Sequence, residues 1–241
     1  MSDPISEAVD PLLVAADAAL GNGYSAVLYG SAARGDYVPG ASDINLLLVL
    51  DDVGPAALRA LGPAFLEWRT RTPEPPLLVS REEWARATDV FPIEITDMQS
   101  AHRLLRGADP LTGLSVSRAD LRRALESELR GKLLRLRQGY TLLAERPADL
   151  GTLARSSVPT ALVLFRCLLT LTGETVAPAD ADAIVRRAAD VVGFAPAAPL
   201  DIVRNRGVAG WRCSAQLFET YLDTIVRTAR HVDQLHPGDA S

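Results

Sequence analysis

The sequence predicts an α+β protein, in which a domain built on a β-sheet is followed by a C-terminal helical bundle. Helix and strand signals are mixed in the first half of the chain, and residues 107–113 have the composition of a hinge. Beyond the hinge, apolar residues recur every three or four positions, the period of amphipathic helices. We therefore expect a sheet domain over residues 1–112 and a bundle of four or five helices over residues 113–241.

Short apolar runs bounded by turn residues predict the strands of the first domain. The clearest is residues 45–50, which follow a loop rich in proline, glycine and serine. Ser80 and Glu83 have the spacing of a capping box, which predicts a helix up to Arg86. The expected strands are residues 25–29, 45–50, 77–80 and 91–96, and the expected helices are residues 11–20, 31–35 and 55–69.

Helix signals dominate the second domain. Ser117 and Asp120 match a capping signature, and the leucines from 121 to 143 step by three and four along one face. Pro159 suits the first turn of a second helix that ends at Gly173. Two further helices are expected over residues 178–192 and 211–235.

Composition narrows the class of protein. The net charge of −5 gives no strong signal for nucleic-acid binding, and two cysteines make no disulfide framework. The N-terminus has no basic segment of the kind that begins a signal peptide, so we expect a cytoplasmic protein. The most apolar segment, residues 158–172, is short for a bilayer and contains Arg166, so no membrane partner is expected. A homodimer is left open.

One stretch of the first domain has the pattern of a phosphate and metal site. Gly30 and Ser31 follow a predicted strand and open a helical turn, where free backbone amides and the serine hydroxyl can hold an anion. Asp43 and Asn45 are two residues apart at the head of the next strand, which puts both side chains on one face. Either pair alone is weak evidence for a site, but the order and spacing of the two pairs favour a common phosphate and metal site.

The stretch "GSAARGDYVPGASDINLLLVL" resembles the signature of the polymerase-β-type nucleotidyltransferase superfamily. The likeness is to small bacterial members such as aminoglycoside adenylyltransferases and antitoxin-like minimal nucleotidyltransferases. It implies a mixed sheet, a triphosphate held at Gly30 and Ser31, and Mg²⁺ held by the Asp-x-Asp pair. In the family a third carboxylate from a later strand serves as metal ligand or general base. "FPIEIT" resembles that strand, which gives the role to Glu94.

The resemblance assigns Mg²⁺ to Asp43, Asn45 and Glu94, and catalysis to Asp43 and Glu94. The departure is Asn45, where the family usually has a second aspartate. An amide oxygen is a hard ligand but carries no charge, so it weakens the site without abolishing it. Two functions follow. One is Mg²⁺-dependent transfer of a nucleoside monophosphate from an NTP, with ATP favoured, to a hydroxyl of a small molecule or protein. The other is a catalytically silent nucleotide-binding or antitoxin-like interaction protein.

Two cations are further candidates for the nucleotide site. Arg34 could bind the nucleotide, or it could fix the loop by pairing with Asp36. Lys132, the single lysine among 25 basic residues, could contact the triphosphate or form a surface pair with Glu128. Glu94 could also face solvent. We expect Asp97 and His102 to be ordinary residues of a strand end and a helix.

Overall fold

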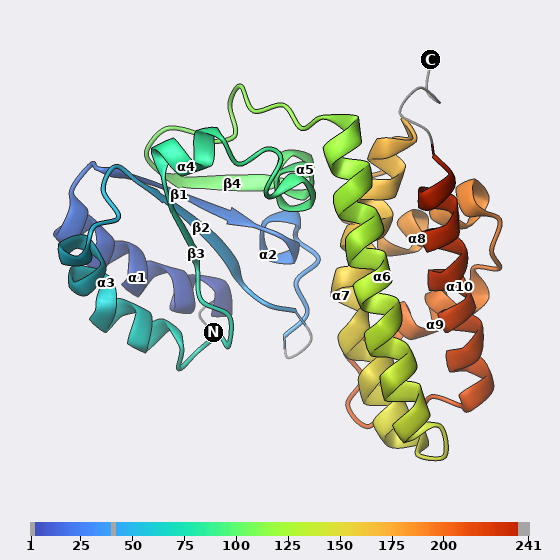
Figure 1. Ribbon diagram of the computed structural model, residues 1–241. Helices are drawn as coiled ribbons and strands as arrows, with labels where there is room; N and C mark the ends of the chain where they lie inside the picture. Colours follow the sequence, from blue (N-terminus) through green and yellow to red (C-terminus); the bar gives the residue numbers. More distant parts are fainter. Residues whose placement is uncertain (1–2, 40–41, 236–241) are drawn as a thin grey trace. The chain divides into compact units, whose positions relative to one another are not determined.

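The computed structural model describes residues 3–39 and 42–235 (Figure 1). The chain divides into two compact units. The sheet unit comprises Met1–Tyr37, Ser42–Phe91 and Met98–Ser115, and the helical unit comprises Val38–Ala41, Pro92–Asp97 and Val116–Ser241. Two short segments of the first half of the sequence are thus grouped with the helical unit. The fold is α+β, as predicted.

The sheet unit contains one mixed four-stranded sheet. Its strands are β1 (Tyr24–Tyr29), β2 (Asn45–Leu50), β3 (Leu77–Ser80) and β4 (His102–Arg106), in the order β3-β2-β1-β4. β1 runs antiparallel to β2 and β4, whereas β2 and β3 are parallel and are joined through a helix. Three of these strands are those that the sequence predicts.

Two helices, α1 (Pro4–Leu20) and α3 (Pro55–Trp68), lie side by side against one face of the sheet (Figure 1). Alternate strand residues point into the core between the sheet and these helices, because side chains along a strand alternate between its faces. The strand and loop residues of this core are Tyr24, Ala26, Leu28, Ile44, Leu46, Leu48 and Leu50. The first helix begins seven residues before its predicted start and contains Pro11.

The predicted strand over residues 91–96 is wrong. Residues Pro92–Ser100 form helix α5, with Pro92 in its first turn, where a missing N–H costs nothing. The strand of this region follows as β4, which the sequence pattern did not indicate. α4 (Arg81–Ala85) has the predicted capping box, since the Ser80 hydroxyl accepts from the Glu83 amide and Glu83 accepts from the Ser80 amide.

Five helices form the C-terminal part of the helical unit, within the predicted number. They are α6 (Arg118–Leu143), α7 (Pro147–Leu171), α8 (Ala181–Val192), α9 (Ala197–Arg204) and α10 (Ala215–Gln234). The Ser117 hydroxyl caps α6 by accepting from the Asp120 amide, as predicted. α7 begins at Pro147, so Pro159 lies inside it and does not start it.

α7 is the most deeply packed helix of the bundle. By length and composition it could cross a membrane, yet 56% of its most apolar window is buried inside the protein. It contacts α6, α8, α9 and α10, so its apolar surface serves the core of the bundle.

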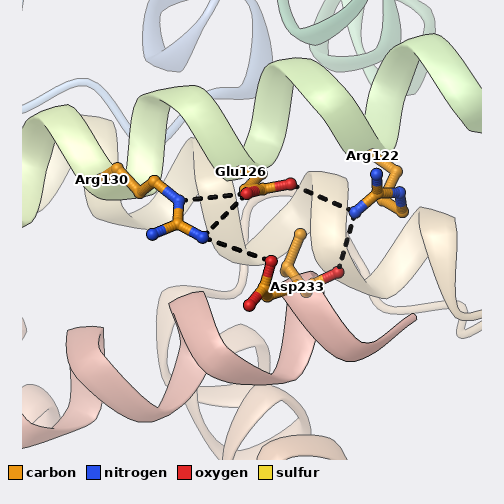
Figure 2. Close-up of polar contacts among 5 residues, drawn as sticks. Arg122, Glu126, Arg130 and Asp233 are labelled. Carbon is orange, nitrogen blue, oxygen red and sulfur yellow. Dashed lines mark hydrogen bonds and ion pairs between the residues drawn. The ribbon is translucent and has the colours of Figure 1, made fainter. Parts of the chain in front are cut away.

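The many arginines of α6 are largely paired. Figure 2 shows Arg122 and Arg130 on either side of Glu126, with Arg130 also reaching Asp233 near the end of α10. Arg122 donates in addition to the main-chain oxygen of Val232. Part of the positive charge between residues 118 and 137 therefore links α6 to α10 through these contacts. That part is not available to a ligand.

Candidate functional site

Gly30 occupies a conformation that favours glycine. It links β1 to the short helix α2 (Ser31–Arg34) with φ 72°. A Cβ atom at this position would lie 2.6 Å from the Nδ2 atom of Asn45. Both the positive φ and the absence of a side chain are thus required for the approach of the two segments.

Asn45 lies beside this turn because of the strand register. Tyr29, the last residue of β1, is paired with Asn45, the first residue of β2. Gly30 and Ser31 follow directly, so the predicted phosphate loop and the amide side chain meet at one end of the sheet. Gly30 and Asn45 are thus brought together, and their roles in binding phosphate and metal stay predictions.

Asp43 belongs to the same end of the sheet and is exposed. Leu46 is buried in the core against α1 and α3, so the side chain of Asn45, the residue before it in the strand, turns to the opposite face. An exposed carboxylate thus lies two residues before the amide that approaches Gly30.

Arg34 is the last residue of α2, and its side chain is largely buried. Its Nε lies 3.4 Å from Oδ1 of Asp36, and the two side chains are only 6% and 14% exposed. A largely buried ion pair two residues apart fits the loop-fixing alternative. The nucleotide-binding role of Arg34 stays a prediction without further support.

Glu94 lies on α5, not on a strand, and is grouped with the helical unit. Although the residue as a whole is exposed, desolvation around its carboxyl raises the pKa of Glu94, and the carboxylates of Glu128 and Asp97 add to the shift. A carboxyl with a raised pKa suits a general base. The catalytic and metal roles of Glu94 stay predictions.

Asp97, three residues further along α5, is a buried partner of Arg166. The Arg166 Nε donates to Asp97 Oδ1 at 2.7 Å, and both side chains are 7% exposed. The expectation that Asp97 is an ordinary strand-end residue is wrong, because this ion pair ties α5 to α7 within the helical unit.

Lys132 lies inside the bundle. It is 4% exposed, and its Nζ donates to the main-chain oxygen of Ser157 at 2.6 Å. The surface pair with Glu128 is therefore not what holds it. An internal acceptor accounts for the lysine, and its contact with a triphosphate stays a prediction.

A metal would find few protein ligands at the sheet end. Among residues 3–39 and 42–235, no three or more His, Cys, Asp and Glu side chains gather in a group that could hold a metal ion. Asp43 and Asn45 nevertheless supply a carboxylate and an amide, the oxygen donors that Mg²⁺ prefers. Since Mg²⁺ usually takes one or two carboxylates and completes its shell with water and substrate phosphates, the pair fits a magnesium ion that arrives with a nucleotide.

The fold is similar to that of a solved adenyltransferase. Among the solved structures that match is the spectinomycin adenyltransferase AAD(9) from Enterococcus faecialis with ATP and spectinomycin, with a TM-score of 0.62. The match covers 95% of this chain and 99% of that chain at 14% sequence identity, so it speaks for the fold alone. No protein-family model and no curated protein sequence matches the chain.

Proposed function

We propose that the protein is a Mg²⁺-dependent nucleotidyltransferase that transfers a nucleoside monophosphate from an NTP, with ATP favoured, to a hydroxyl acceptor. The observation that carries the proposal is the meeting of Gly30 and Asn45 at the sheet end, next to Asp43. It is supported by the fold shared with an adenyltransferase whose structure contains ATP.

In this proposal the chain's own residues bind and orient the nucleotide. The turn at Gly30 and Ser31 offers main-chain amides and a hydroxyl to the triphosphate. Asp43 and Asn45 hold Mg²⁺, which neutralises the phosphate charge when bound. Glu94 is the proposed base for the acceptor hydroxyl, a role to which its raised pKa is suited.

The alternative is a nucleotide-binding protein without transfer activity, and Asn45 is the observation that favours it. Replacing a carboxylate with an amide removes one negative charge from the metal site, and the described residues contain no group of three or more His, Cys, Asp and Glu side chains that could hold the ion instead. Both functions predict nucleotide binding at the same sheet end, so only turnover separates them.

Turnover is tested by pyrophosphate release from each NTP with Mg²⁺ and a panel of hydroxyl compounds, including aminocyclitols and a protein extract. Transfer is read from label that moves from α-labelled ATP to an acceptor. Pyrophosphate release that Asp43→Asn abolishes would support the transferase. ATP binding with no release in any acceptor mixture would favour the silent alternative.

A further inference from the structure

A histidine that the sequence pattern marks as ordinary lies at the same end of the sheet as the proposed nucleotide site. His102 is the first residue of β4, and it is paired with Tyr29, the residue before Gly30. Tyr29 is paired on its other side with Asn45. Three adjacent strands thus place Asn45, Tyr29 and His102 in one row.

The side chains of this row share a face. Directly paired residues of antiparallel strands point to the same side, with Cβ atoms about 5 Å apart. That side is opposite to the core formed with α1 and α3, since Leu28 and Leu46 point into that core. α2, which follows Gly30, also contacts β4. His102 therefore shares with Asn45 both the end and the face of the sheet.

The ring of His102 is held between two acceptors. Its Nδ1 lies 3.0 Å from the main-chain oxygen of Met98, and its Nε2 lies 3.2 Å from Oδ2 of Asp109. A carbonyl can only accept, so Nδ1 carries a proton. An ionised Asp109 carboxylate accepts from Nε2 when that nitrogen carries a proton as well, and in this form the ring can donate to an anion.

Asp109 belongs to a loop whose ends are set by glycines. Gly107 and Gly113 have φ values of 70° and 81°, and the Asp109 Oδ1 accepts from the Leu111 amide at 2.9 Å. Neither side chain of the pair is deeply buried, with 23% of His102 and 33% of Asp109 exposed. An anion from solvent can therefore reach Nε2 by displacing one carboxylate oxygen.

We propose that His102 is a phosphate-binding residue of the nucleotide site, and that the Asp109 carboxylate occupies the place of a phosphate oxygen until the nucleotide arrives. This inference rests on the proposed function for the identity of the ligand, a nucleoside triphosphate. A ring that donates from Nε2 suits a site in which Asn45 has replaced a carboxylate, because it gives the phosphates a donor in addition to the metal ion. His102 and Asp109 thereby join the site from β4 and the loop after it.

The test is binding of inorganic tripolyphosphate, measured by calorimetry in metal-free buffer at pH 6. His102→Gln removes the ring donor and should weaken binding about tenfold, as expected for a hydrogen bond to a charged group. Asp109→Asn removes the competing charge and keeps the acceptor for Leu111, so it should strengthen binding several-fold. His231→Gln and Asp89→Asn are the matched controls, and neither should change the affinity.

The two substitutions should change tripolyphosphate affinity in opposite directions, and this result is decisive. If the pair were merely structural, both variants would bind tripolyphosphate as the wild type does or more weakly. Should His102→Gln prove unstable in a thermal melt, Asp109→Asn decides alone. Unchanged or weaker binding by Asp109→Asn overturns the inference. If wild-type protein binds ATP with Mg²⁺ while neither substitution alters tripolyphosphate binding, the inference fails and the proposed function stands. A wild-type protein that binds neither ligand overturns both.

Discussion

At the scale of single residues, the turn at Gly30 is the most constrained point of the site. Its φ of 72° disfavours any side chain, and a Cβ atom on it would lie 2.6 Å from the amide nitrogen of Asn45 across the turn. Gly35, at the other end of α2, has a similar φ of 85° but nothing within 4 Å of the place that a Cβ atom would take. Comparing substitutions at the two glycines therefore separates the effect of backbone strain from the effect of contact with Asn45.

Gly30→Ala should lower the free energy of unfolding more than Gly35→Ala. Both substitutions carry the strain of a positive φ, about 1–2 kcal/mol, and only the first displaces Asn45. ATP affinity should fall with Gly30→Ala and stay constant with Gly35→Ala. Urea denaturation and calorimetry of the two variants measure this, and equal losses of ATP affinity would remove Gly30 from the site.

Asn45→Asp restores the carboxylate that the family resemblance leads one to expect. The added charge should strengthen Mg²⁺-dependent ATP binding, because the metal then meets two carboxylates in place of one. Asn22→Asp, at an exposed turn of the same unit, adds the same charge elsewhere and should have no effect. Titration of Mg²⁺ at constant ATP checks the prediction, and an unaltered metal dependence would show that Asn45 is not a ligand.

At the scale of elements, α5 is held in the helical unit by the Asp97–Arg166 ion pair. Removing one partner of a buried pair leaves an unpaired charge and typically costs about 3–5 kcal/mol. Asp97→Asn should therefore lower the urea midpoint of the helical unit strongly. The control is Asp223→Asn, whose partner Arg227 is half-exposed and whose loss should cost less than about 1 kcal/mol. Similar midpoints for both variants would contradict the structural role of Asp97.

The packing of α6 on α7 encloses a charged lysine, which has a consequence for pH. Burial lowers the pKa of Lys132 to about 8, from an ordinary value of 10.5. Between these values the unfolded chain binds more protons than the folded one, so this group makes stability rise as pH increases. Lys132→Met should abolish that rise, and the difference between wild type and variant from pH 7.5 to 10.5 isolates it. A flat difference would mean that the ammonium is not buried. ATP affinity of the same variant tests the predicted triphosphate contact.

The elements also show where sequence reasoning succeeds. The strands of the motif were predictable because turn residues bound a continuous apolar run, as at Asn45–Leu50. A strand was wrongly predicted over residues 91–96 because Ile93 and Ile95 flank Glu94 in the alternation typical of a strand. Pro92 in fact begins a helix. β4 was not predicted because this edge strand contains Arg103 and Arg106 and therefore has no apolar run.

At the scale of the whole molecule, the site residues that could be grouped from the sequence were those close together in the chain. Gly30, Ser31, Asp43 and Asn45 fall within one short stretch, so a local pattern was enough to predict their meeting. The pairing of His102 with Tyr29 depends on strand order, and the pair Asp97–Arg166 spans 69 residues. Contacts of that range follow from the tertiary fold, and no local pattern indicates them.

The central claim is that one end of the sheet binds a magnesium nucleotide through Asp43 and its neighbours. The most direct measurement is calorimetric titration of ATP into wild-type protein, Asp43→Asn and the control Asp89→Asn, each with and without Mg²⁺. Binding should require Mg²⁺ in the wild type and the control and should be lost in Asp43→Asn. Equal binding by all three proteins, or none by the wild type, would contradict it.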